Sequence, residues 1–326
     1  MKMLAVLAKS LHNRLNIALA SLLLLIAYVG FMYVPVSATS NVSGSVSSLA
    51  VSPPTFYLSA NPGDTLSESI RVENITPVIQ HISVSLENFV PLGTEGQVNI
   101  TNQTNRYSLI SWISVNPENA AIAGYGTQIF NFKINVPQNA EPSGKFGSII
   151  FSTSPNKLGN GSSVSVSQRV GDLILLRIAG KADENIFVKK FSVKTGGNLP
   201  SNSLSLTALV SNIGNVQVKP IGYITIRNMF GTQVAEIPFP GEYILPSAER
   251  NLTTFWKHGL LFGQYRATIT ALYGLSNKIL TASTTFVVIP WSLIIIILVI
   301  GLVVGSLLWL GRVRIKRAVK ILLGKE

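Results

Sequence analysis

Two short stretches, VENITPV at 72–78 and VSNIGNV at 210–216, share the pattern V-x-N-I-x-x-V. Two further pairs of stretches match in layout and keep the same order along the chain: IAGYGTQIF at 122–130 with ILPSAERNL at 244–252, and GKFGSII at 144–150 with GQYRATI at 263–269. Each match is weak by itself. Together they predict two copies of one supersecondary unit, with loops of different length.

Apolar and polar residues alternate through most of the chain between the two terminal segments, as in HISVSLEN at 81–88, IFNFKINV at 129–136 and SLSLTALV at 203–210. This period is typical of half-buried strands, and stretches rich in Gly, Pro, Asn and Asp separate the runs. Short antiparallel strands at this spacing indicate β-sandwiches. The predicted fold is therefore all-β, with two tandem Ig-like β-sandwich domains between an N-terminal signal helix and one C-terminal transmembrane helix.

The repeated stretches also predict local roles. Asn74 and Asn212 would lie in the turn of a hairpin that joins one strand to the next, because asparagine tolerates turn conformations. Gly144 and Gly263 would each begin a late strand of their copy.

Residues 1–38 have the layout of a secretory signal peptide. Basic residues precede an apolar run at 17–34, and small residues follow up to Ala38. The apolar run is long for a signal peptide, so an uncleaved N-terminal membrane segment is the alternative. Export from the cytoplasm follows in either case.

Residues 289–310 are predicted to form a transmembrane helix. About twenty uncharged residues would span the hydrocarbon core, with Trp291 and Trp309 at its two interfaces. The tail at 311–326 is basic and carries Arg312, Arg314, Lys316 and Arg317. The positive-inside rule predicts a single-pass cell-membrane protein with a cytoplasmic C-terminus and extracellular Ig-like domains.

A G-x-x-x-G pattern, formed by Gly301 and Gly305, lies inside the predicted membrane helix. Small residues at this spacing allow close helix pairing and hence a weak homodimer. Glycine is also frequent in such helices for other reasons, so both interpretations stay open.

Between the terminal segments we expect three parts. A flexible stalk at 39–51 would precede Ig-like domain 1 at 52–181 and Ig-like domain 2 at 183–288. The connection between the two domains is so short that their relative orientation should be restricted.

Charge and composition exclude several classes of function. The net charge is +12, but residues 39–289 carry 17 Lys and Arg against 13 Asp and Glu, an excess of only +4. Most of the excess is therefore a topology signal, and we expect no nucleic-acid partner. The chain has no cysteine, so it forms no disulfides, which fits a bacterial envelope protein.

No catalytic or cofactor site is predicted. The three histidines, His12, His81 and His258, are far apart in the sequence, and a zinc site needs three or four ligands close together. The only adjacent acidic pair in the exported part is Asp183 and Glu184, which we interpret as a solvated pair at the domain joint. We therefore expect no enzyme activity, no cofactor and no metal.

The stretches PPTFYLSANPGDTLSESIRVENIT at 53–76 and SWISVNPENAAIAGYGTQIFNFKINVPQNAEPSGKFGSIIF at 111–151 resemble the first domain of WxL-interacting proteins. These are bacterial surface proteins with a signal peptide, two Ig-like domains, one C-terminal helix and a basic tail. The resemblance implies a first domain that binds peptidoglycan and a second that binds a host or partner protein. No binding residue can be transferred to this chain.

The leading hypothesis is a membrane-anchored, non-catalytic bacterial cell-surface scaffold. Its suspected partners are peptidoglycan or another cell-wall polymer, and a surface or host protein. The alternative is an envelope assembly factor that resembles pilus chaperones and binds clients by strand addition. Such a protein should expose an apolar edge strand, and ILLRIA at 174–179 is the candidate.

Overall fold

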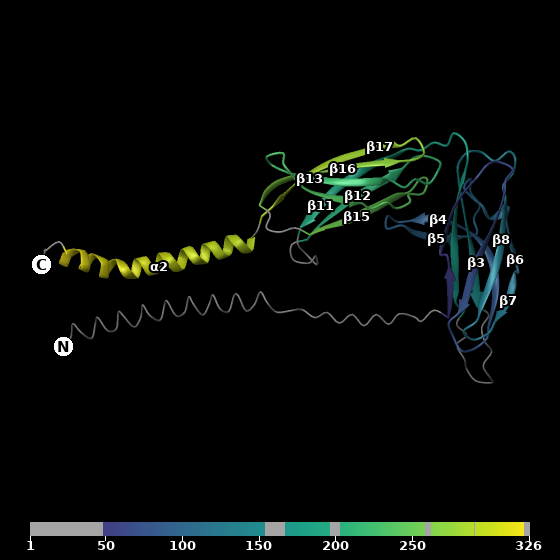
Figure 1. Cartoon of the computed structure of the whole chain (residues 1–326), viewed down its shortest axis with the longest axis horizontal. Helices are drawn as coiled ribbons and strands as arrows, with labels where there is room; N and C mark the ends of the chain where they lie inside the picture. The colour runs from purple at the N-terminus through teal and green to yellow at the C-terminus, as the bar shows by residue number, and fades with distance from the viewer. Residues whose placement is uncertain (1–47, 154–166, 196–202, 258–261, 290, 323–326) are drawn as a thin grey trace. The chain divides into compact units, whose positions relative to one another are not determined.

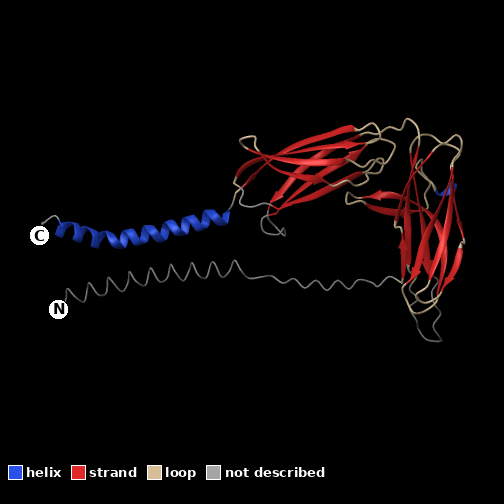
Figure 2. Cartoon of the chain, in the orientation of Figure 1, coloured by secondary structure: helices blue, strands red, loops and turns tan. Residues whose placement is uncertain are grey.

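The computed structural model describes residues 48–153, 167–195, 203–257, 262–289 and 291–322. It is an all-β protein with sandwich-like sheets, followed by one long helix (Figures 1 and 2). The β-strands belong to one compact unit, and the helix belongs to another.

The first sandwich consists of two sheets. A four-stranded sheet has the order β1-β3-β8-β6, with bounds Leu49–Ser52, Thr65–Asn74, Thr127–Asn135 and Ile113–Asn116. The facing sheet has the order β2-β10-β9-β4-β5, with bounds Thr55–Ala60, Arg169–Ile178, Gly144–Thr153, Gln80–Leu92 and Gln97–Thr101. Strand β7 (Asn119–Ile122) also pairs with β4, and a 3₁₀ turn, η1, covers Ile110–Trp112.

The second sandwich has a three-stranded and a four-stranded sheet. The first has the order β11-β12-β15, with bounds Ile186–Thr195, Ser203–Asn212 and Glu249–Lys257. The second has the order β14-β13-β16-β17, with bounds Gln233–Phe239, Ile221–Asn228, Gly263–Tyr273 and Lys278–Val288.

Alternation in the sequence becomes burial in the sandwiches. In β8, Phe130, Phe132 and Ile134 are at most 1% exposed, while their polar neighbours face solvent. In β12, Leu204, Leu206 and Ala208 occupy the corresponding place in a separate core. Each sandwich thus buries its own apolar face, and burial at about 25 cal/mol per Å² is the main stabilising contribution.

The paired asparagines have the same role in both sandwiches. The Nδ2 group of Asn74 donates to the carbonyls of Val78 and Ile122, at 2.6 and 3.1 Å. The Nδ2 group of Asn212 donates to the carbonyls of Val216 and Ile244, both at 2.9 Å. Both side chains are buried, so these bonds satisfy groups that water cannot reach.

The hairpin prediction for these asparagines is wrong. Asn74 and Asn212 end strands β3 and β12, and the following strands, β4 and β13, lie in the opposite sheets. The stretch therefore connects the two sheets of its sandwich. The buried amide bonds this connection to the loop at Ile122 in the first sandwich and at Ile244 in the second. Gly144 and Gly263 do begin strands β9 and β16, as predicted.

The second pair of repeated stretches supplies the loops that the asparagines hold. Ile122 and Ile244 begin these stretches, and their carbonyls accept the two amide bonds. Three residues further on, Tyr125 and Ser247 have φ values of 58° and 59°. Two non-glycine residues in this uncommon region at equivalent positions indicate that the two copies share a backbone course as well as a pattern.

Helix α2 (Trp291–Leu322) follows the second sandwich, and it corrects the prediction of a transmembrane helix at 289–310. The helix does not end where the apolar run ends, but continues through the basic residues in one piece. No helix in the described part of the chain is long and apolar enough to cross a membrane.

The residues predicted to set topology and pairing all lie in this helix, namely Trp291, Gly301, Gly305, Trp309, Arg312, Arg314, Lys316 and Arg317. The guanidinium of Arg312 lies 5.4 Å from the ring centre of Trp309. A Cβ added at Gly301 or Gly305 would have no neighbour within 4 Å. Their roles in orientation and pairing stay predictions.

The remaining domain limits also stay predictions. The segment at 1–38 lies outside the described residues. Strand β1 begins at Leu49, inside the predicted stalk at 39–51. Leu49 is only 2% exposed and packs in the first core, so this end of the predicted stalk belongs to the sandwich.

Candidate protein-binding site

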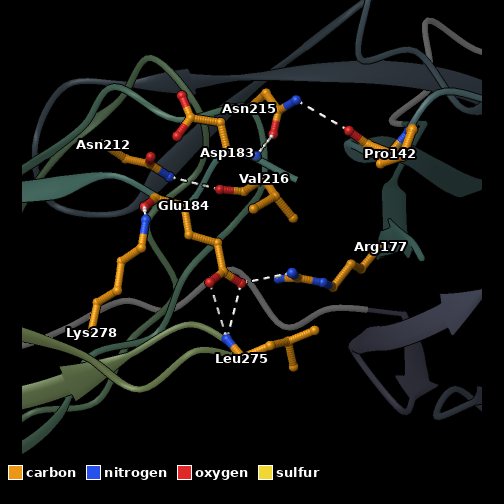
Figure 3. A network of polar contacts seen from close by, with 9 residues as sticks. All are labelled: Pro142, Arg177, Asp183, Glu184, Asn212, Asn215, Val216, Leu275 and Lys278. Carbon is orange, nitrogen blue, oxygen red and sulfur yellow. Dashed lines mark hydrogen bonds and ion pairs between the residues drawn. The ribbon is translucent and has the colours of Figure 1, made fainter. Parts of the chain in front are cut away.

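The joint between the sandwiches is built around Glu184, which follows β10 and precedes β11. Its carboxylate is 4% exposed and lies 2.6 Å from Nη2 of Arg177. The backbone N–H of Leu275 donates to both carboxylate oxygens, at 3.0 and 3.1 Å (Figure 3). The interpretation of Asp183 and Glu184 as a solvated pair is therefore wrong for Glu184. A buried carboxylate needs such partners because desolvation of a charge is costly.

The main chain around this carboxylate is equally constrained. Lys278 Nζ donates to the backbone carbonyl of Glu184 at 2.6 Å. Gly274 has a φ of 72°, and a Cβ there would lie 2.0 Å from Glu184 Oε2. Only glycine fits this turn, because both the conformation and the space exclude a side chain.

A second polar bridge uses Asn215, which belongs to the repeated stretch at 210–216. Its Nδ2 donates to the carbonyl of Pro142 at 3.1 Å, and its Oδ1 accepts from the N–H of Asp183 at 2.8 Å (Figure 3). Its carbonyl accepts from the N–H of Gly144 at 2.9 Å. The stretch thus ties the start of β9 to the second sandwich.

Apolar contacts continue the joint. Phe89, Phe146 and Leu175 form a small buried cluster, against which Tyr243 and Leu245 of the second sandwich pack. The ring of Phe146 therefore contacts apolar and aromatic side chains of this cluster.

Two tyrosines meet at the edge of this cluster. The rings of Tyr57 and Tyr243 stack at 4.4 Å with an angle of 18° between their planes. Burial, and secondarily the nearby Tyr57, raises the pKa of Tyr243. The Lys219 ammonium lies 5.7 Å from the Tyr243 ring centre. Strand β2, which carries Tyr57, therefore borders the joint directly.

The β4–β5 turn makes a third contact. The backbone N–H of Asn251 donates to the carbonyl of Thr94 at 2.7 Å, and its Nδ2 donates to Glu95 Oε1, also at 2.7 Å. These bonds, the Glu184 site, the Asn215 bridge and the apolar cluster together hold the two sandwiches in contact.

Strand β2 is an edge strand, and its pairing shows which backbone groups are free. It pairs in parallel with β10 and has no other strand partner among the described residues. The carbonyls of Pro54 and Ala60 accept from Leu173 and Ala179 of the β10 side. Because backbone groups alternate sides along a strand, the N–H and C=O groups of Thr55, Tyr57 and Ser59 point to the open edge.

This edge lacks the features that usually protect edges from pairing. Strand β11, at another edge, has Lys189, Lys190 and an irregular register between Val188 and Lys190. Strand β14 contains Pro238. By contrast, β2 has neither a charge nor a proline between its ends. Charges, prolines and bulges discourage strand addition, so β2 is a competent template.

Strand β10 extends this edge. Strand β2 pairs with β10 only along Leu173–Ile178, whereas β9 pairs with β10 from Arg169 onward. Within the described residues, the first four positions of β10 thus have a strand neighbour on one side only.

The predicted edge strand ILLRIA at 174–179 is not an edge. Most of it is β10, which pairs with β2 on one side and β9 on the other, and Ile174, Leu176 and Ile178 are in the core. The open edge is the neighbouring β2, TFYLSA. A short uncharged strand directly after Pro53 and Pro54 was the signal in the sequence.

The described residues hold no group of three or more His, Cys, Asp or Glu side chains that could bind a metal ion. What the site offers is main-chain donors and acceptors, aromatic rings and a nearby ammonium group, all of which suit recognition of an extended polypeptide.

No family model and no curated protein matches this chain. Among solved structures, the class 5 fimbriae chaperone CfaA matches with 14% identity and a TM-score of 0.38, covering 74% of this chain and 99% of that one. The E. coli chaperone DraB matches with 13% identity and a TM-score of 0.33, covering 74% and 96%.

A third similar structure is the CsuC–CsuE chaperone–tip adhesion subunit pre-assembly complex from Acinetobacter baumannii, with 11% identity and a TM-score of 0.35. It covers 73% of this chain and 98% of its own. Likenesses this distant do not transfer a function, which must be argued from the site.

These findings correct the leading functional hypothesis. Each of the three similar structures contains a chaperone, and two of these are chaperones of fimbriae or pili. The described helix does not qualify as a membrane span. The membrane-anchored, peptidoglycan-binding scaffold is therefore withdrawn as the leading hypothesis. The resemblance to WxL-interacting proteins stays a prediction.

Proposed function

We propose that this protein is a non-catalytic, pilus-chaperone-like assembly factor with two Ig-like sandwiches, and that it binds an extended segment of a client protein by strand addition along β2. The observation that carries this proposal is the open edge of β2, with the outward N–H and C=O groups of Thr55, Tyr57 and Ser59. In this mode, main-chain hydrogen bonds supply affinity and alternate side chains supply specificity.

The surroundings of the edge support the same function. The Tyr57 ring is 56% exposed although it stacks on Tyr243, so one face remains open to an apolar client side chain. Lys219 lies over Tyr243 and offers a positive charge beside the same ring. A client strand on β2 would therefore meet aromatic and charged groups of the second sandwich.

The client that this site suits is a protein whose own sheet lacks an edge strand. Such a protein exposes unpaired backbone groups, and these are the groups that β2 can satisfy. One similar complex contains a tip adhesion subunit, and another contains a pilin. An exported fibre subunit is therefore the first client to test. The predicted signal segment at 1–38 would place the protein outside the cytoplasm.

Photocrosslinking in the source cells tests this proposal. The photoreactive residue p-benzoylphenylalanine would replace Tyr57, or Tyr223 as a matched control that is 43% exposed on β13. We expect a polypeptide adduct from position 57 only. Adding Ser59→Pro should abolish it, because proline removes an outward N–H while the bonds to β10 remain.

Two results would contradict strand addition at β2. One is equal crosslinking from both positions. The other is an adduct at position 57 that survives Ser59→Pro, provided that the thermal melt shows the variant to be folded.

A further inference from the structure

Two arginines face each other at the end of the second sandwich opposite to the joint. Arg227 on β13 pairs in register with Arg266 on β16, and both side chains are exposed. Residues directly opposite on antiparallel strands have Cβ atoms about 5 Å apart, and like charges at such positions repel. Such a pair destabilises the sheet unless a negative charge lies between the two guanidinium groups.

No acidic side chain in the described residues forms an ion pair with either arginine. Arg227 Nη1 donates to the carbonyl of Gly231 at 3.3 Å. Glu236 is on the neighbouring strand, but it is opposite Thr225 and accepts a bond from Gln233 at 3.3 Å. Most of the five N–H donors that each guanidinium carries are thus available to a ligand.

The arginines line a groove of about 310 Å³. The other residues around it are Asn228, Met229, Gly231, Gln264, Tyr265 and Thr285. This volume is at the lower end of the range for small-molecule sites in proteins.

The turn that carries Met229 and Gly231 is held in place beside the groove. Asn228 Oδ1 accepts from the backbone N–H groups of Phe230 and Thr232, both at 3.0 Å. This turn leaves Met229 57% and Phe230 84% exposed. Phe262, just before β16, is 73% exposed. Exposed apolar side chains in and next to the turn that lines a charged groove suit a ligand with both an anionic and an apolar part.

We propose that this groove binds an amphiphilic phosphate ester, such as an alkyl phosphate or the headgroup region of an anionic phospholipid. A phosphate monoester carries about −1.5 to −2 charges, which offsets two guanidinium groups, and the single negative charge of a phosphodiester headgroup offsets them in part. The phosphate oxygens would accept hydrogen bonds from paired N–H groups of Arg227 and Arg266, since guanidinium and phosphate match in geometry. Met229 and Phe230 cover the attached carbon chain.

Isothermal titration of the full chain tests the proposal with hexyl phosphate, inorganic phosphate and hexan-1-ol as probes. Hexyl phosphate should bind at one site, and inorganic phosphate should bind at least tenfold more weakly. Hexan-1-ol should give no site. Arg227→Gln and Arg266→Gln should each weaken hexyl phosphate at least tenfold, whereas Arg71→Gln, an exposed strand arginine of the first sandwich, should have no effect. Phe230→Ala should reduce the preference for hexyl phosphate over phosphate.

Dihexanoyl phosphatidylglycerol below its micelle concentration separates the two sources of the ligand. Binding of this lipid as well as hexyl phosphate assigns the groove to lipid headgroups, and binding of hexyl phosphate alone assigns it to soluble phosphate monoesters. The proposal is overturned if neither probe binds, if binding survives in the folded double arginine variant, or if inorganic phosphate binds as tightly as hexyl phosphate.

Discussion

Asp172 is a buried carboxyl group in the core of the first sandwich, and its replacement should change how stability depends on pH. The residue is in β10, and its side chain faces inward on the same side as Ile174. It is 0% exposed, and neither carboxyl oxygen has a hydrogen-bond partner in the described part of the chain. Burial raises its pKa from 3.8 to about 7.

The size of the effect follows from this pKa. The folded protein holds the proton between about pH 4 and pH 7, where the unfolded chain has lost it, so the free energy of unfolding falls as pH rises through this window. The pKa difference of about 3 units, at about 1.4 kcal/mol per unit, gives a loss of about 4 kcal/mol. Below about pH 4 the ionisation of Asp172 takes nothing from the free energy of unfolding, and above about pH 7 the full loss has occurred.

Urea unfolding of wild type and Asp172→Asn, followed by circular dichroism across this pH window, measures the effect. The variant should be the less sensitive protein, and its stability relative to wild type should rise by about 4 kcal/mol from about pH 4 to about pH 8. The buried amide has its own cost, but this cost does not depend on pH. Asp183→Asn, at an exposed position, is the control. A constant difference between Asp172→Asn and wild type at all pH values would refute the reasoning.

Three further predictions concern stability and use the same unfolding assay. Glu184→Gln should cost about 3 to 5 kcal/mol because it leaves the largely buried Arg177 without its charge partner, whereas loss of the more exposed Lys189–Glu249 pair should cost under about 1 kcal/mol; equal costs would contradict the burial argument. Gly274→Ala should destabilise far more than Gly93→Ala, since both have positive φ but only the first Cβ would strike a neighbour. Asn212→Ala should cost about 2 to 3 kcal/mol, and a loss below about 0.5 kcal/mol would show that its buried bonds are unimportant.

The sequence was sufficient to predict the strands and the internal repeat, because alternation and turn residues are local signals. The role of Asn74 and Asn212 was not predictable from such signals. Their amide groups bond to Ile122 and Ile244, which are distant in sequence, so the partner becomes visible only when the two sheets face each other.

The site was harder to predict for the same reason. Glu184 looked solvated because its neighbour in sequence is also acidic, while its real partners are Arg177 and the N–H of Leu275. The apolar character of the run at 174–179 predicts an edge for strand addition, but continuous apolar character is also typical of a central strand covered on both faces. Arg227 and Arg266 meet only through the strand register.

The parallel pairing of β2 with β10 sets an order of events during synthesis. Thr55 pairs with Leu173, so β2 has no partner in its sheet until nearly the whole first sandwich has emerged. Contacts between residues so distant in sequence are slow to form, because a long loop must close first. During that interval TFYLSA remains an uncharged strand with both edges unpaired, so a nascent chain is more exposed to wrong pairing than the finished protein. The bonds from Leu275 and Lys278 to Glu184 can form only after most of the second sandwich has followed.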